Sequence, residues 1–145
     1  SEGESETAVV KLTITPQYAF LPFITHNFHV SDEPNNVCTQ AYPLQINQIH
    51  PFYANDRNDW YEFELTQTQA VRVELTEFTP IEGQLVVASG SCGQGNLTLV
   101  GHNADFSPTK IINLGEMAPG RYYIWVITEV PTSSGTPYKL NIIAN

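Results

Sequence analysis

The feature that most constrains the fold of this chain is a series of short segments in which apolar and polar residues alternate. Residues 59–65 (DWYEFEL) and residues 70–78 (AVRVELTEF) show the pattern most clearly. A period of two places every second side chain on one face of a β-strand, and no window shows the period of an amphipathic helix. The residues expected to face the core from these two strands are Tyr61, Phe63, Leu65, Val71, Val73 and Leu75.

Similar segments recur along the chain, and turn-forming sequences separate them. Residues that favour turns dominate the connections TPIEG, SGSCGQG, ADFSP, MAPG and PTSSGTP. Many short strands with turns at this spacing predict an all-β protein, built as an antiparallel sandwich or barrel. The other expected strands cover residues 8–16, 39–46, 84–89, 96–101, 109–115, 121–127 and 137–143.

Residues 1–30 differ from the rest of the chain. Residues 1–7 are acidic and lack periodicity, which indicates a solvated tail. Residues 18–30 are apolar and aromatic but contain Pro22, so we expect an extended arm or a linker from an upstream domain. One domain then covers residues 31–145. The protein is expected to be a monomer, or a dimer in which this arm pairs with a neighbouring subunit.

The charge of the chain argues against two classes of partner. Nucleic-acid binding needs a basic patch, and so does attraction to an anionic membrane surface. The net charge is −9, and no apolar run reaches the length of a transmembrane helix. We therefore expect neither a nucleic-acid nor a membrane partner. The six basic residues are scattered singly: Lys11, Arg57, Arg72, Lys110, Arg121 and Lys139.

Two cysteines, Cys38 and Cys92, bear on localisation. The chain has few lysines and many Asn, Thr and Ser residues, a composition typical of secreted proteins, in which disulfides form. We expect a disulfide between these cysteines and a secreted or cell-surface protein; two buried free thiols are the alternative. Their spacing matches neither a CxxC redox motif nor a structural zinc site.

Four motifs occur in an order that is typical of one family. They are DEPNN (32–36), NDRNDWYEFEL (55–65), MAPGRYYIWV (117–126) and GTPYKLNI (135–142). In this order the chain resembles the bacterial pre-peptidase C-terminal domain and the related collagen-binding domains of clostridial collagenases. The resemblance implies a jelly-roll-like β-sandwich attached to a secreted hydrolase, with a peptidase as the first expectation. It implies a non-catalytic role in secretion, maturation or the binding of a polymeric substrate.

The same resemblance implies a calcium site. In calcium-binding members, the EPNN segment meets the Asp-rich turn. The matching residues here are Glu33, Asn35, Asp56 and Asp59. Asn36 offers a further amide oxygen, and calcium takes six to eight oxygen ligands. The alternative is that these Asn and Asp residues only form turns, and Arg57 would place a positive charge inside the site.

The sequence contains no clear catalytic constellation. His26 and His29 lie three residues apart in a segment expected to be extended, where surface or packing roles are commoner than metal binding. Glu62 and Glu64 share an outward strand face, an arrangement compatible with paired glycosidase carboxylates, but solvated strand positions also explain them. We assign no catalytic residue and expect a protein that is not an enzyme.

The segment RYYIWVI (121–127) carries the candidate ligand site. The family pattern turns Tyr122, Ile124 and Val126 toward the core. Tyr123 and Trp125 then face outward as an aromatic strip, which fits a sugar ring or a polypeptide surface. The alternative is that aromatic residues of the N-terminal arm cover this strip.

These observations favour a non-catalytic accessory domain of a secreted hydrolase, which binds a protein fibre or a polysaccharide. A carbohydrate-binding module on a similar sandwich is the second candidate. An adhesion or assembly domain, whose arm pairs with a neighbouring sheet, is the third.

Overall fold

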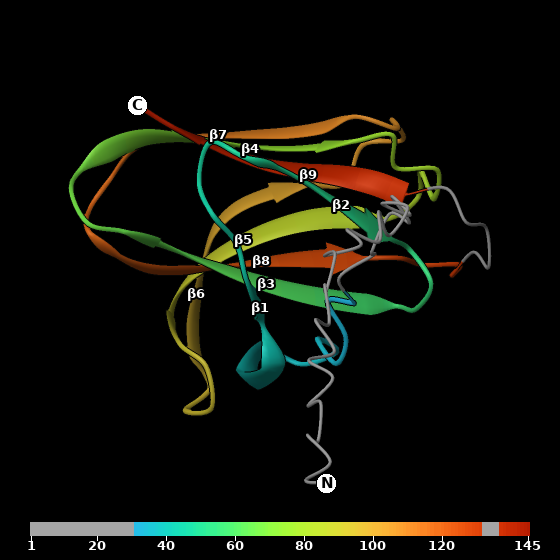
Figure 1. The fold of residues 1–145 in the computed structure, drawn as a ribbon, viewed down its shortest axis with the longest axis horizontal. Helices are drawn as coiled ribbons and strands as arrows, with labels where there is room; N and C mark the ends of the chain where they lie inside the picture. The colour runs from blue at the N-terminus through green and yellow to red at the C-terminus, as the bar shows by residue number, and fades with distance from the viewer. Residues whose placement is uncertain (1–30, 132–136) are drawn as a thin grey trace, which may run out of the picture. The chain divides into compact units, whose positions relative to one another are not determined.

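The computed structural model describes residues 31–131 and 137–145, and in these ranges the chain is an all-β sandwich, as predicted (Figure 1). The expected strand over residues 8–16 and the arm over residues 18–30 lie outside the described residues. Within the described part, the one helical element is a single 3-10 turn, η1 (Cys38–Gln40). No helix of that part is long and apolar enough to cross a membrane.

Two sheets form the sandwich, with strand orders β1-β3-β8-β5-β6 and β2-β9-β4-β7. Apart from the parallel pair β1–β3, neighbouring strands are antiparallel. From β2 to β9, successive strands lie in opposite sheets in the manner of a jelly roll, except that β5 and β6 are neighbours in one sheet. The strands are β1 (Tyr42–Pro43), β2 (Ile49–Tyr53), β3 (Asn58–Leu65), β4 (Gln69–Thr76), β5 (Gln84–Ser91), β6 (Asn96–Asn103), β7 (Lys110–Met117), β8 (Gly120–Ile127) and β9 (Pro137–Ala144).

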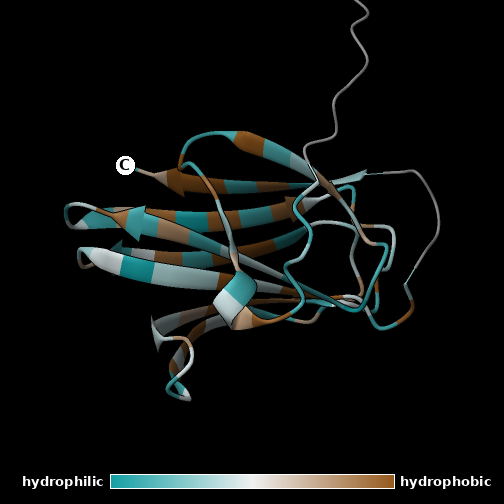
Figure 2. Cartoon of the chain, turned by 60° about the horizontal axis from the view of Figure 1, so that its bottom comes forward, coloured by the Kyte–Doolittle hydropathy of each residue, from teal (hydrophilic) through white to brown (hydrophobic). Residues whose placement is uncertain are grey.

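The core lies between the sheets and is filled by the faces that the alternation predicted. All six residues expected to point inward from β3 and β4 are at most 3% exposed. Figure 2 shows the hydrophobic and hydrophilic bands that alternate along the strands. Strand β8 contributes the three residues that the family pattern placed in the core: Tyr122, Ile124 and Val126.

Two segments differ from the expectation. The strand predicted over residues 39–46 is mostly loop, because η1 occupies its start and Tyr42–Pro43 alone pairs with β3. Strand β2 was not predicted, because Pro51 interrupts its apolar pattern. It lies at the edge of its sheet, where a residue without an N–H group is tolerated.

One end of the sandwich collects several connecting loops. Strand pairing places Asn58 at the start of β3 beside Ile127 at the end of β8, and Ile127 beside Gln84 at the start of β5. Leu75 near the end of β4 pairs with Lys110 at the start of β7. The segments that meet at this end are residues 54–57, 77–83, 104–109 and 128–131.

Cys38 and Cys92 form the predicted disulfide, with Cα atoms 5.7 Å apart, inside the usual range. Cys38 precedes the edge strand β1, whereas Cys92 follows β5, and β3 and β8 lie between these strands in the sheet. The bond therefore fastens the η1 segment across two intervening strands.

Replacement of both cysteines with serine is expected to lower the free energy of unfolding by about 4 kcal/mol. The reason is that the bond joins residues 54 positions apart and so restricts a long loop of the unfolded chain. Urea unfolding of this variant and of the reduced wild-type protein measures the loss. The two losses should agree, and a wild-type stability that does not respond to reductant would contradict the expectation.

Candidate functional site

Two segments that are distant in the sequence meet at the start of β3. The N–H group of Trp60 donates to the carbonyl oxygen of Asn35 over 2.8 Å, so the DEPNN segment extends the hydrogen bonding of the strand. The Asn35 side chain is 0% exposed, and that of Asp59 is 1% exposed. The segment over residues 32–36 is therefore docked against the turn that leads into β3.

An acidic cluster forms at this junction. Glu33, Asp56 and Asp59 each offer a carboxylate oxygen, and these oxygens lie within 4.8 Å of one another. Asp32 lies close enough to repel Asp59 and Glu33. Among residues 31–131 and 137–145, no Lys or Arg forms an ion pair with these four acids. The structure thus gathers negative charge without a compensating cationic side chain in its described part.

Local hydrogen bonds orient the carboxylate groups of the cluster. One oxygen of Glu33 accepts from the N–H group of Asn35 (3.1 Å) and from the side-chain amide of Asn36 (3.3 Å). Asp32 accepts from Nδ2 of Asn35 over 3.0 Å. The amide nitrogen atoms are therefore used to position carboxylates. Asn36 is exposed and supports Glu33 in this way.

Three oxygen atoms of the cluster are left without a partner. The Oδ1 atoms of Asn35, Asp56 and Asp59 are all buried and accept no hydrogen bond in the structure. Buried polar atoms are nearly always satisfied, and an unpartnered acceptor costs about 1–3 kcal/mol. Three such acceptors at one junction could be satisfied by a cation.

Two core tyrosines link Asp32 to Asp59 through a chain of hydrogen bonds. Tyr61 donates to Oδ2 of Asp32 (2.7 Å), and Tyr138 donates to Oδ2 of Asp59 (2.9 Å). The two hydroxyl oxygens are themselves 2.6 Å apart. Three consecutive hydrogen bonds need three hydrogens, but two hydroxyl groups supply two. A proton on one carboxyl group completes the chain, because that carboxyl group then donates to its tyrosine and frees the tyrosine hydrogen for the bond between the two hydroxyl groups.

Of the two carboxyl groups at the ends of this chain, that of Asp59 is the more deeply buried and favours the proton more. Burial raises the pKa of Asp59 to about 8, and repulsion from Asp56 adds to the shift. Burial also raises the pKa of Asp32 and of Glu33. Without a cation, Asp59 is therefore mostly protonated at neutral pH.

The donor set has the chemistry of a site for a hard divalent cation. The donors are carboxylate and amide oxygens, without the His or Cys ligands that zinc prefers. Arg57 does not enter the cluster, because its Nη2 atom donates to the carbonyl oxygen of Glu129 over 3.5 Å. The cluster could therefore hold a metal ion.

The aromatic surface differs from the predicted strip. Tyr123 lies on the outward side of β8 but is only 6% exposed, so it offers little surface to a ligand. Trp125 instead stacks on Trp60 of β3, with ring centroids 4.8 Å apart and planes at 11°. Adjacent strands are about 4.8 Å apart, whereas alternate residues of one strand are about 6.7 Å apart, so rings stack more readily across strands.

The tryptophan pair is half-buried and held by a polar contact. Nε1 of Trp125 donates to Oδ1 of Asn58 over 3.2 Å. Because the rings stack face to face, their inner faces are occupied. A ligand on this side of the sheet would therefore contact the ring edges and the outer faces.

Sequence reasoning missed three contributors to the site: Asp32, Tyr61 and Tyr138. Asp32 precedes the EPNN motif directly, and Tyr61 was expected only to fill the core. A tyrosine at an inward strand position indicates a buried polar partner, because its hydroxyl group requires a hydrogen bond. The pairing of two tyrosines 77 residues apart depends on the packing of the two sheets.

Comparisons with known proteins support the fold. No protein-family model and no curated protein matches this chain. The pre-peptidase C-terminal domain of a collagenase from Bacillus anthracis matches with a TM-score of 0.50 and 14% identity, over 69% of this chain and 91% of that one. This likeness shows the β-sandwich fold.

A second solved structure, a β-1,3-glucan-binding CBM6 domain from Bacillus halodurans, matches with a TM-score of 0.34 and 15% identity. The match covers 68% of this chain and 84% of that one. The similarity is too low to support a structural inference.

Without metal, the stability of the protein is expected to fall as the pH rises from about 4 to about 8. In this interval the Asp59 carboxyl group is ionised in the unfolded chain but protonated in the folded one, so the folded state binds more protons. Asp32 and Glu33 act in the same direction, because their pKa values are also raised. Urea unfolding in EDTA should show a loss of at least about 1 kcal/mol between pH 5 and pH 8.

Asp59→Asn is the matched variant, because it keeps the shape of the side chain and removes the titrating group. Its stability should change less over the same interval. An equal pH dependence in both proteins would show that Asp59 does not hold the proton.

Proposed function

We propose that this chain is a non-catalytic accessory domain of a secreted hydrolase, related to pre-peptidase C-terminal domains. In this proposal it binds calcium between residues 32–36 and the start of β3, and it binds a polymeric substrate on its surface. The observation that carries the proposal is the set of buried, unpartnered oxygen atoms on Asn35, Asp56 and Asp59 beside the carboxylate of Glu33.

Calcium fits this set better than other common metals. Glu33, Asn35, Asp56 and Asp59 supply four side-chain oxygens, and bidentate carboxylates or water would complete the six to eight that calcium takes. Magnesium demands near-ideal octahedral geometry and retains several waters, so it suits a partly buried cluster of several protein ligands less well. A bound calcium ion supplies the positive charge that the clustered carboxylates lack. Asn36 positions Glu33 and is the outermost member of the group.

A structural role for the ion follows from where its ligands lie. Glu33 and Asn35 belong to the DEPNN segment, whereas Asp56 and Asp59 belong to the turn and to the first residues of β3. An ion that binds both groups joins a loop to the sheet. It stabilises the folded state, because the unfolded chain does not hold these groups together and binds the ion more weakly.

The disulfide supports a secreted or cell-surface location, since such bonds persist in oxidising environments. It also leaves neither cysteine as a free thiol for catalysis. Of the two histidines in the described ranges, His50 bonds the carbonyl oxygen of Gln45 and His102 bonds the side chain of Gln84. Neither contact pairs a histidine with a carboxylate or a nucleophile, which agrees with a binding role.

The stacked Trp60–Trp125 pair is the favoured contact for a polymeric substrate, which can be a protein fibre or a polysaccharide. Tyr123 lies beside the pair but contributes little exposed area. The same aromatic pair favours the second candidate function, a carbohydrate-binding module, because sugar rings pack on indole surfaces.

Calcium is expected to raise the melting temperature by about 10 °C at a free concentration about 100 times its Kd, and EDTA should reverse the effect. The gain arises because the ion binds the folded protein and compensates its buried carboxylates. Differential scanning calorimetry with and without calcium measures the shift.

Asp59→Asn and Glu33→Gln should each reduce this calcium-dependent shift by more than half. Glu64→Gln is the matched control, because it removes an equal charge from an exposed position near the other end of β3. A wild-type melting temperature that is the same in calcium and in EDTA would contradict calcium binding. Hydrogen bonds alone would then hold residues 32–36 against the start of β3.

Retention on insoluble polymers tests the binding role. The protein should be retained on at least one of collagen, cellulose, chitin and xylan, and Trp125→Ala should reduce that retention about fivefold through the loss of aromatic contact. Phe106→Ala is the control, because this ring is 75% exposed and lies outside the stacked pair. Retention on a polysaccharide alone would favour the carbohydrate-binding module, and no retention on any of the four would count against polymer binding.

A further inference from the structure

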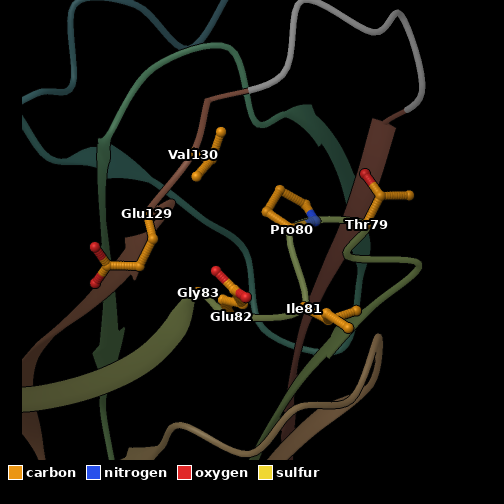
Figure 3. Close-up of a pocket in the computed structure, with 7 residues that line it drawn as sticks. All are labelled: Thr79, Pro80, Ile81, Glu82, Gly83, Glu129 and Val130. Carbon is orange, nitrogen blue, oxygen red and sulfur yellow. The ribbon is translucent and has the colours of Figure 1, made fainter.

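A pocket lies at the same end of the sandwich as the acidic cluster, between the loop that joins β4 to β5 and the residues that follow β8 (Figure 3). Its volume is about 260 Å³. Pockets for small-molecule ligands usually occupy about 300–1,000 Å³, so this one fits a single long side chain better than a cofactor. The residues that line it are Thr79, Pro80, Ile81, Glu82, Gly83, Glu129 and Val130.

The loop that forms one wall is held in place from several directions. The N–H group of Gly83 donates to the carbonyl oxygen of Pro80 over 2.8 Å. A Cβ atom at Gly83 would collide with the carbonyl oxygen of Ile127 and with the ring of Phe78, so glycine permits the close approach to β8. The ammonium group of Lys110 donates to the carbonyl oxygen of Ile81 over 3.1 Å. These contacts fix the conformation of the loop and therefore the shape of this wall of the pocket.

The lining combines apolar surface with two carboxylates. Pro80, Ile81 and Val130 provide the apolar part, and Glu82 and Glu129 provide the charges. Figure 3 shows the Glu82 carboxylate between Pro80 and Glu129. Glu82 has no hydrogen-bond or ion-pair partner among the described residues, whereas Glu129 accepts from Nε2 of Gln84 over 3.4 Å. No basic residue lines the pocket.

Two cationic side chains contact the loops that form the pocket, but neither forms an ion pair with Glu82 or Glu129. The Lys110 side chain is fully buried and pairs with Asp105, and Arg57 contacts the carbonyl oxygen of Glu129. The remaining basic residues of the described ranges form ion pairs with other acids. These pairs are Arg72–Glu74, Arg121–Glu62 and Lys139–Glu77. Among residues 31–131 and 137–145, therefore, no basic side chain forms an ion pair with either pocket acid.

We propose that this pocket binds a lysine or arginine side chain of a polypeptide. Such a side chain has an apolar stem, which suits Pro80, Ile81 and Val130, and a cationic end, which suits Glu82 and Glu129. A neutral sugar would make no use of the two charges. This proposal rests on the proposed function only in naming the polymer as a polypeptide, since the pocket shares no residue with the metal cluster or with the tryptophan pair.

Capped peptides of the form Gly-Gly-X-Gly-Gly test the proposal by NMR titration of the full chain in low salt, with calcium present to occupy the acidic cluster. X is lysine, arginine, Nε-acetyllysine or norleucine. The lysine and arginine peptides should shift the amide signals of Gly83 and Val130, with a Kd at least about fivefold lower than that of the uncharged pair. Salt at 0.5 M should remove this difference, because it screens exposed charges beyond a few ångströms.

The double variant Glu82→Gln/Glu129→Gln should abolish the preference for charged peptides, and Glu64→Gln/Glu116→Gln, which removes two exposed charges elsewhere, should retain it. Equal binding of the norleucine peptide, or no shift at Gly83 and Val130 with any peptide, would overturn the proposal. Charge-dependent shifts that persist in the Glu82/Glu129 variant would also overturn it, since they would belong to another acidic surface. Each of these results is independent of whether the protein binds calcium or an insoluble polymer.

Discussion

The buried carboxyl group of Asp59 is the constraint on which the rest of the structure depends. Its side chain is 1% exposed, and an ionised carboxylate in such a place costs several kcal/mol unless a proton or a cation compensates it. The alternation that buries Tyr61 and Phe63 also buries Asp59, because the three side chains share one face of β3. The strand cannot fill the core without carrying this carboxyl group inside.

A proton and a metal ion compensate Asp59 in mutually exclusive ways. The proton completes the hydrogen-bonded chain through Tyr138 and Tyr61 to Asp32. A divalent cation would instead need Asp59 in its ionised form, beside the carboxylates of Glu33 and Asp56. Metal binding at such a site releases protons, so its affinity rises with pH. The tyrosine contacts come from the core, whereas the proposed metal ligands come from the loops and from the start of β3.

Much of this fold follows from local pattern, and much of the site does not. Period-two alternation is enough to place Tyr61, Phe63 and Leu65 in the core, because side-chain direction in a strand is a local property. Register and sheet packing are not local. The stack of Trp60 on Trp125 depends on how two strands pair, and the Tyr61–Tyr138 contact depends on how two sheets face each other. The motifs near Glu33 and Asp59 could be related to each other through family resemblance, whereas spacing alone did not show that they meet.

Adjacent residues of β3 connect the acidic cluster to the aromatic surface. Asp59 points into the sandwich and Trp60 points out of it, as consecutive residues of a strand must. The backbone N–H group of Trp60 is held by the carbonyl oxygen of Asn35, whose own side chain belongs to the cluster. Any change in how the segment over residues 32–36 docks therefore acts on the backbone that carries Trp60. The stacked rings are a reporter of that change, because indole fluorescence responds to ring contact and solvent exposure.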